Sequence, residues 1–128
     1  MAIRIVRLGT PRIQEEGVRL GTVRHPPRGV PRAEHASRDF YDVWLPDLAP
    51  SAPLVKEAQH ATDVRAWRRF EARYRAEMKR PGAARLLALL AALSRRTDFS
   101  VGCYCAEETR CHRSVLRALL QEHGAVLA

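Results

Sequence analysis

Apolar and polar side chains recur along the chain in patterns that predict both strands and helices. Residues 3–8 (IRIVRL) alternate apolar and basic side chains, which is typical of a half-buried strand. Residues 18–24 (VRLGTVR) predict a second strand, in which Gly21 indicates a bulge or a close approach of another segment. Three prolines and a glycine in residues 25–32 then predict a stiff loop.

The middle of the chain is predicted to be mainly helical. Residues 38–48 favour a short helix or turn, and Ser51 is placed to cap a short helix over residues 53–59. A longer helix over residues 64–80 is expected to begin after Asp63, its N-cap residue. One face of this helix collects apolar side chains at steps of three and four, namely Val64, Trp67, Phe70, Tyr74 and Met78. The next helix, over residues 83–95, is apolar nearly all round, which predicts burial on most sides.

The last third of the chain predicts a strand followed by a helix. Residues 99–105 (FSVGCYC) are typical of a buried strand, and a helix is expected from Cys111 to His123, with Thr109 as N-cap and Gly124 after its end. The order of these elements indicates an α/β fold with a small, at least partly parallel sheet covered by helices, in a single domain over residues 1–128. Ligands of parallel sheets gather at the carboxyl ends of the strands.

Length and composition narrow the classes of protein that fit. The chain has 128 residues, 46% of them hydrophobic, and can form a core without disulfides. Its longest apolar run, Leu86 to Leu93, is far shorter than the ~20 residues of a membrane span. The first residues also lack a signal-peptide pattern. We therefore expect a cytoplasmic protein without a membrane partner, whose three cysteines are reduced, metal-bound, catalytic or simply buried.

Charge adds a second possible class of partner. The net charge is +8, which is typical of proteins that bind nucleic acid. Of the 22 basic residues 20 are Arg, however, and with abundant Ala this bias is also what a GC-rich genome produces. Basic zones at residues 1–38 and 64–80 flank an acidic zone at residues 39–63.

The strongest candidate site is the turn at residues 103–113 (CYCAEETRCHR), between the last predicted strand and helix. The free N–H groups and dipole at a helix N-terminus favour anions and lower the pKa of a nearby thiol. Cys105 or Cys111 is then the candidate reactive group, and His112 or Glu107 the group that moves protons. Arg113 is placed to hold phosphate or carboxylate, with Ser114 beside it as a further ligand.

Other chemistries of the same turn remain open. The cysteines and His112 are also common as buried structural residues. Cys103, Cys105, Cys111 and His112 offer the three sulfurs and one nitrogen of a zinc site, although adjacent ligands at 111 and 112 fit one tetrahedral centre poorly. A redox pair of Cys105 with Cys111 is a third possibility. A phosphatase-type loop is rejected, because no arginine stands at the required spacing from Cys105.

Two further arginines are placed to join this turn. Arg24 stands at the end of the second predicted strand, and Arg28 lies in the stiff loop beside Gly29. A stiff loop holds a guanidinium group at a lower entropic cost than a flexible loop. If the sheet brings the loop beside residues 105–113, Arg24, Arg28 and Arg113 converge on one anion, most simply a phosphate; the alternative is solvated surface charge.

Three blocks of residues also follow one another in a familiar order. They are a strand that runs into a Pro-Arg-Gly loop (Arg24, Pro27, Arg28 and Gly29), a Trp-Leu block that continues into Leu-Ala-Pro-Ser (Trp44, Leu45, Leu48, Ala49, Pro50 and Ser51), and a helix with Phe70, Arg73, Tyr74 and Glu77. With Cys111-His112-Arg113, they resemble the YeaO-like uncharacterised family (domain of unknown function 488) over nearly the whole chain. Many members have Asp-Arg-Leu-Trp where residues 23–26 here are Val-Arg-His-Pro. The resemblance implies an α/β domain and no established activity.

The residues therefore predict one of three functions. The first is an α/β protein that binds a phosphate-bearing or other anionic small molecule, either as a binding protein or as an enzyme that uses the Cys-His-Arg turn. No cofactor is expected in that case, with zinc as the alternative. The second is a basic nucleic-acid-binding or regulatory module without catalysis, and the third a structural or interaction protein without chemistry.

Overall fold

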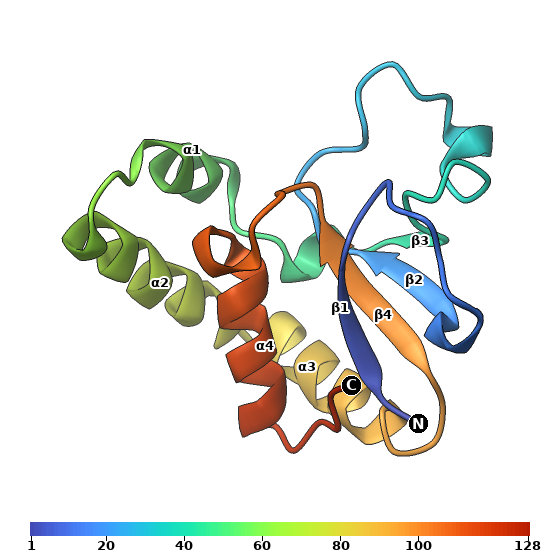
Figure 1. The fold of residues 1–128 in the computed structure, drawn as a ribbon. Coiled ribbons are helices and arrows are strands. Elements are labelled where there is room, and N and C mark those ends of the chain that lie inside the picture. The colour runs from blue at the N-terminus through green and yellow to red at the C-terminus, as the bar shows by residue number, and fades with distance from the viewer.

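A parallel sheet of four strands lies at the centre of the computed structural model, which describes residues 1–128 apart from the side chain of Arg110 (Figure 1). The strands are β1 (Ile3–Arg7), β2 (Val18–Gly21), β3 (Val43–Trp44) and β4 (Phe99–Cys103), and their order is β1-β4-β2-β3. All neighbours pair in parallel. The last strand in sequence thus lies between the first two, and all its residues are buried. This arrangement confirms the predicted α/β fold.

The helices gather on one side of the sheet (Figure 1). They are α1 (Ala52–His60), α2 (Val64–Met78), α3 (Pro81–Leu93) and α4 (His112–Glu122). The main core contains residues from all four helices together with Ile3, Phe99 and Val101 of the strands. The predicted N-cap is confirmed, because Asp63 Oδ1 accepts a hydrogen bond of 2.7 Å from the Ala66 N–H. None of the helices in the described part of the chain is long and apolar enough to cross a membrane.

Several local predictions were wrong. Residues 43–44 form an edge strand where a short helix or turn was expected. The prediction failed because the strand depends on long-range pairing with Leu20 and Gly21, which a pattern of two residues does not indicate. Both apolar side chains of β3 are exposed, so these two residues do not show the alternation of buried and exposed positions that indicates a strand. The helix α3 is buried along one face only, with Leu89 53% and Leu93 39% exposed, because no side chain that the structure describes covers its outer side.

The boundaries around the last turn also differ from the prediction. The strand β4 ends at Cys103 and not at residue 105, so Cys105 lies in the turn itself. The helix α4 begins at His112 with Cys111, not Thr109, as its N-cap residue. A short 3-10 helix over Glu108–Arg110 occupies the interval. The predicted Gly124 follows α4 with φ +86°, a left-handed conformation that glycine favours at helix ends.

The side of the sheet away from the helices is held by a buried ion pair. Arg19, in β2, is fully buried, and its Nε lies 2.5 Å from Oε1 of Glu16. The same guanidinium donates to the carbonyl oxygens of Thr10 and Asp39, and Ser100 of β4 donates to Glu16 at 2.9 Å. Every charge in this group is therefore partnered, which a buried pair requires.

Candidate functional site

The predicted Cys/His/Arg turn lies at the carboxyl end of β4, in the middle of the sheet. Because β4 runs between β1 and β2, the turn that follows it lies beside the residues that follow β2. The three cysteines occupy different environments there. Cys103 and Cys111 are each 2% exposed, whereas Cys105 is exposed. Of the three thiols, only that of Cys105 is open to a ligand from solution.

The two buried cysteines contact each other. The sulfurs of Cys103 and Cys111 lie 2.6 Å apart, and both side chains belong to a second core cluster with Leu8, Val23 and Tyr41. The structure therefore places Cys103, at the end of β4, against Cys111, at the start of α4. The predicted redox pair joined Cys105 to Cys111. Cys103 takes the place of Cys105 in this contact because β4 ends two residues earlier than expected.

His112 is held in one orientation and one protonation state. Its Nε2 lies 2.8 Å from the carbonyl oxygen of Thr22, and because a carbonyl only accepts, Nε2 carries the proton. Nδ1 then has a free lone pair, which faces Cys111 Sγ at 3.8 Å. The ring also meets the edge of Tyr74, with centroids 5.7 Å apart. Burial lowers the pKa of His112 to about 4, against the effect of the Thr22 hydrogen bond, so the imidazole is neutral near pH 7.

The three thiols share their protons unequally. Interaction with the neighbouring thiols of Cys103 and Cys111 lowers the pKa of Cys105, against the opposing effect of burial. The positive charge of Arg113 lowers it further. Hydrogen bonding to Cys105 and Cys111 raises the pKa of Cys103. The hydrogen bond with Cys103 lowers the pKa of Cys111, but that with Cys105 and burial outweigh it and raise this pKa to about 11. Of the three thiols, that of Cys105 is therefore the one most readily deprotonated.

A zinc ion fits this cluster poorly. The ligand atoms of Cys103, Cys111 and His112 lie within 4.8 Å of one another, which brings together three of the four residues predicted for a metal. Sulfurs that each bind zinc at about 2.3 Å are roughly 3.7 Å apart in a tetrahedral site. The 2.6 Å between Cys103 and Cys111 is much shorter. We therefore assign no chemistry to a metal here.

Cys105 and His112 line a cavity with both loop arginines. This cavity has a volume of about 630 Å³ and lies at the carboxyl ends of β2 and β4. Arg24 and Arg28 come from the segment after β2. The opposite wall is formed by residues at the start of the helical layer, namely Pro50, Val55 and Gln59. A second hollow of about 530 Å³ continues from it and shares Cys105 and His112. The structure brings the loop beside the turn, but of the three arginines predicted to converge there, Arg24 and Arg28 line the cavity and Arg113 does not.

Arg24 is oriented by main-chain acceptors. Its Nε donates to the carbonyl of Pro50 at 3.0 Å, and its Nη2 donates to the carbonyls of Pro46 and Ala49, both at 3.2 Å. A guanidinium has five N–H donors, so the two on Nη1 are left for a ligand. Arg28, in contrast, is exposed and follows Pro27 in the loop. One guanidinium is therefore fixed in the wall of the cavity, and the other belongs to an exposed side chain.

The remaining predicted residues lie around the cavity and not in its lining. Arg113 is 4% exposed, and its Nη2 donates to the carbonyl of Cys105, so it positions the turn from behind. Ser114 Oγ donates to the carbonyl of Cys111 in the first turn of α4. Glu107 is exposed in the turn, two residues from Cys105.

Sequence reasoning missed several residues of this region. Tyr104 OH donates to the carbonyl of His25 at 2.8 Å and so ties the turn to the proline-rich loop. Val55 and Gln59 of α1 form the far wall. A glutamine and a valine on a short helix do not indicate a site by their sequence. The position of Tyr104 between two candidate cysteines, in contrast, could have suggested that it belongs to the site.

Comparison with known proteins gives one finding. The model of a family described as DUF488-N3a, the active DUF488-N3 subclade, matches residues 3–124. No curated protein and no solved structure shows a significant match. The matched range includes every strand and helix of the fold and all residues that line the cavity of Arg24, Arg28 and Cys105.

Proposed function

We propose that this chain, which belongs to the DUF488 family, binds a small phosphate-bearing molecule in the cavity of Arg24, Arg28 and Cys105. The thiolate of Cys105 is the reactive group of the protein in this proposal. The family match confirms the resemblance that the residue blocks indicated. One observation carries the proposal: the exposed cysteine, the neutral histidine and two arginines from a separate loop line the same cavity.

Anion binding is supported by how the two arginines are held. The guanidinium of Arg24 loses little freedom on binding, because three main-chain acceptors already orient it. Arg28 adds a second positive charge from the exposed loop. Two guanidinium groups on one side of a small cavity match the several oxygens of a phosphate better than a single carboxylate.

The chemistry that fits is nucleophilic attack by Cys105. Its thiolate forms a bond to an electrophilic atom of the bound molecule, and the leaving group departs with the electrons of the bond that breaks. The leaving group takes its proton from solvent, and Glu107, exposed in the same turn, is the candidate that relays this proton. His112 is neutral and hydrogen-bonded to Thr22, so it serves as an acceptor beside the thiol cluster and not as a charged partner.

The nucleic-acid alternative has less support. Its condition was that the basic zones at residues 1–38 and 64–80 share one surface. In Figure 1 the helix α2 lies on one side of the molecule, and the loops of the first 38 residues lie on the other. This placement of the two backbones does not favour one shared basic face. Binding to a duplex that weakens steeply with salt is the result that would favour this alternative.

Binding of inorganic phosphate tests the proposal directly. We expect Arg28→Ala to weaken phosphate binding by at least about tenfold, because it removes a charge-assisted hydrogen bond. The matched control is Arg65→Ala, an exposed arginine at the start of α2. Calorimetric titration at fixed ionic strength distinguishes the two. Equal affinity in both variants contradicts an anion site at this cavity.

A further inference from the structure

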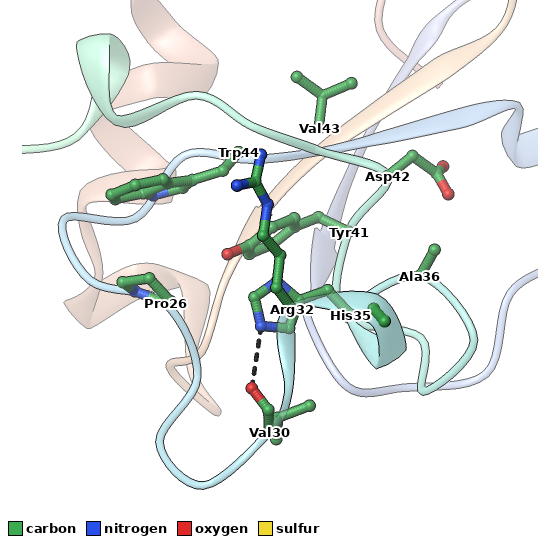
Figure 2. A pocket seen from close by; sticks show the side chains of 10 residues that line it. Pro26, Val30, Arg32, His35, Ala36, Tyr41, Asp42, Val43 and Trp44 are labelled. Carbon is green, nitrogen blue, oxygen red and sulfur yellow. Dashed lines mark hydrogen bonds between the residues drawn. The ribbon is translucent and has the colours of Figure 1, made fainter.

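A third cavity adjoins the one described above and has its own chemistry. It has a volume of about 670 Å³ and lies between the edge strand β3 and the segment of residues 26–36 (Figure 2). Its lining includes Pro26, Arg32, His35, Tyr41 and Trp44. Pro26 lines both this cavity and that of Arg24 and Arg28. The two hollows therefore meet at one residue.

Tyr41 brings an unpartnered buried hydroxyl to this cavity. The residue is 4% exposed, and its hydroxyl is buried without a hydrogen-bond partner among the described residues. A buried hydroxyl in that state is unfavourable, and most such groups in proteins are satisfied. Figure 2 shows the hydroxyl directed into the space among Trp44, Pro26 and the side chain of Arg32.

The ring of Tyr41 is fixed in this direction by its neighbours. It lies over Gly21, where an added Cβ would overlap the ring, so the close approach predicted for this glycine is confirmed. On its other side the ring meets His35 edge-on, with centroids 5.1 Å apart. His35 is itself held by a hydrogen bond between its Nε2 and the carbonyl of Val30 (Figure 2). The hydroxyl therefore has little freedom to turn elsewhere for a partner.

Trp44 supplies a flat apolar surface beside this hydroxyl. Its side chain is 42% exposed, although its indole N–H donates to the carbonyl of Val23 at 2.8 Å. The polar edge is thus satisfied and the ring is held in place, which leaves the ring face for stacking. Arg32 brings a guanidinium that forms no ion pair with any side chain the structure describes. The carboxylate of Asp42 points away from this group in Figure 2 and accepts from Arg12 and from the Arg19 N–H.

We propose that this cavity takes the heteroaromatic base of a mononucleotide whose phosphate lies in the cavity of Arg24 and Arg28, an assignment that rests on the function proposed above. The base stacks on Trp44, and its polar edge forms the hydrogen bond that Tyr41 lacks. Arg32 lies against the base as a cation over an aromatic ring. A free mononucleotide fits better than a polymer, because each cavity has the size of a small-molecule site.

Separate probes for the ring and the phosphate test this assignment. Calorimetric titration would use inorganic phosphate, the four common ribonucleosides, their 5′-monophosphates and a single-stranded oligonucleotide. We expect at least one monophosphate to bind about tenfold or more tightly than phosphate or its own nucleoside. The reason is that the base and the phosphate are joined in one molecule, so binding of one group brings the other to its own cavity. We expect Tyr41→Phe to weaken that monophosphate about tenfold and to leave inorganic phosphate unaffected.

The outcomes separate this inference from the anion site. If every monophosphate binds only as well as inorganic phosphate, the ring assignment is overturned and the anion site stands. If nucleosides bind and depend on Tyr41 while phosphate does not bind, the anion site fails and this cavity stands. Tighter binding of the oligonucleotide than of any monophosphate overturns the assignment to a free nucleotide. Trp44→Ala is a second variant, which tests the proposed stacking of the base on Trp44. Arg65→Ala is the control.

Discussion

The imidazole Nε2 of His112 lies 2.8 Å from the carbonyl oxygen of Thr22, and this hydrogen bond joins the first turn of α4 to the residue that follows β2. It brings the Cys-His-Arg turn against the loop that carries Arg24 and Arg28. The bond also selects the neutral ring form in which Nδ1 faces Cys111. One contact thus fixes both the position of the candidate site and the protonation of its histidine.

Cys105 is expected to react at a lower pH than an ordinary thiol. Because the neighbouring thiols of Cys103 and Cys111 lower its pKa, its thiolate persists below the ordinary value of ~8.5. Site-resolved labelling with iodoacetamide, read by mass spectrometry across pH 5 to 9, measures this directly. Cys103 and Cys111 serve as internal controls and should label only after unfolding, since both are buried. Labelling of Cys105 that rises only near pH 8.5 contradicts the assigned thiolate.

Acid should destabilise the protein through His112. Burial lowers its pKa from 6.5 to about 4, so the unfolded chain takes up this proton before the folded protein does as the pH falls. The stability that His112 contributes is therefore fully present above pH 6.5 and is lost on the way to pH 4. We expect a loss on the order of 3 kcal/mol across this window.

The variant His112→Gln should show a flatter dependence over the same range, and urea denaturation at pH 7.5 and pH 5.0 measures the difference. The control is His60→Gln, an exposed position at the end of α1. An equal decline in the wild type and in His112→Gln would assign the acid sensitivity to other groups.

Glu16 is expected to be essential for stability although it does not line any of the three cavities described above. Its removal leaves the fully buried Arg19 without its carboxylate partner, which is expected to lower the free energy of unfolding by about 3–5 kcal/mol. Chemical denaturation of Glu16→Ala measures this loss. Glu15→Ala is the matched control, because Glu15 is the exposed neighbour. A loss under about 1 kcal/mol for Glu16→Ala would mean that the pair is not the anchor of this face.

Two tyrosines should respond oppositely to loss of the hydroxyl. Tyr41→Phe removes a buried group without a partner in the described part of the chain and should raise the free energy of unfolding by about 1 kcal/mol. Tyr74→Phe removes a buried hydrogen bond of 2.6 Å to the carbonyl of Leu48 and should lower it by about 1 kcal/mol. Thermal and urea denaturation of both variants give the signs. A destabilised Tyr41→Phe would show that the hydroxyl has a structural partner and would remove the main support for the third cavity.

The elements that the sequence predicted well are those whose pattern is local. The helix α2 shows its buried face at steps of three and four through Phe70, Tyr74 and Met78, and its cap at Asp63. The strand β4 shows burial on both faces by a continuous run of small and apolar residues. The edge strand β3 was missed because two exposed residues contain no periodicity, and only their pairing with β2 makes them a strand.

For the site, the sequence by itself determined which residue types stand in the strand-to-helix turn and that two arginines stand in a stiff loop. Only the tertiary structure decided which of them meet. It placed Cys103 and not Cys105 against Cys111, put Arg113 behind the turn, and left Tyr41 without a partner beside Trp44. The reason is physical. The pattern of a chain indicates which side of an element is buried, whereas these contacts depend on β4 pairing with β2 and β1, which lie 81 and 96 residues earlier in the chain.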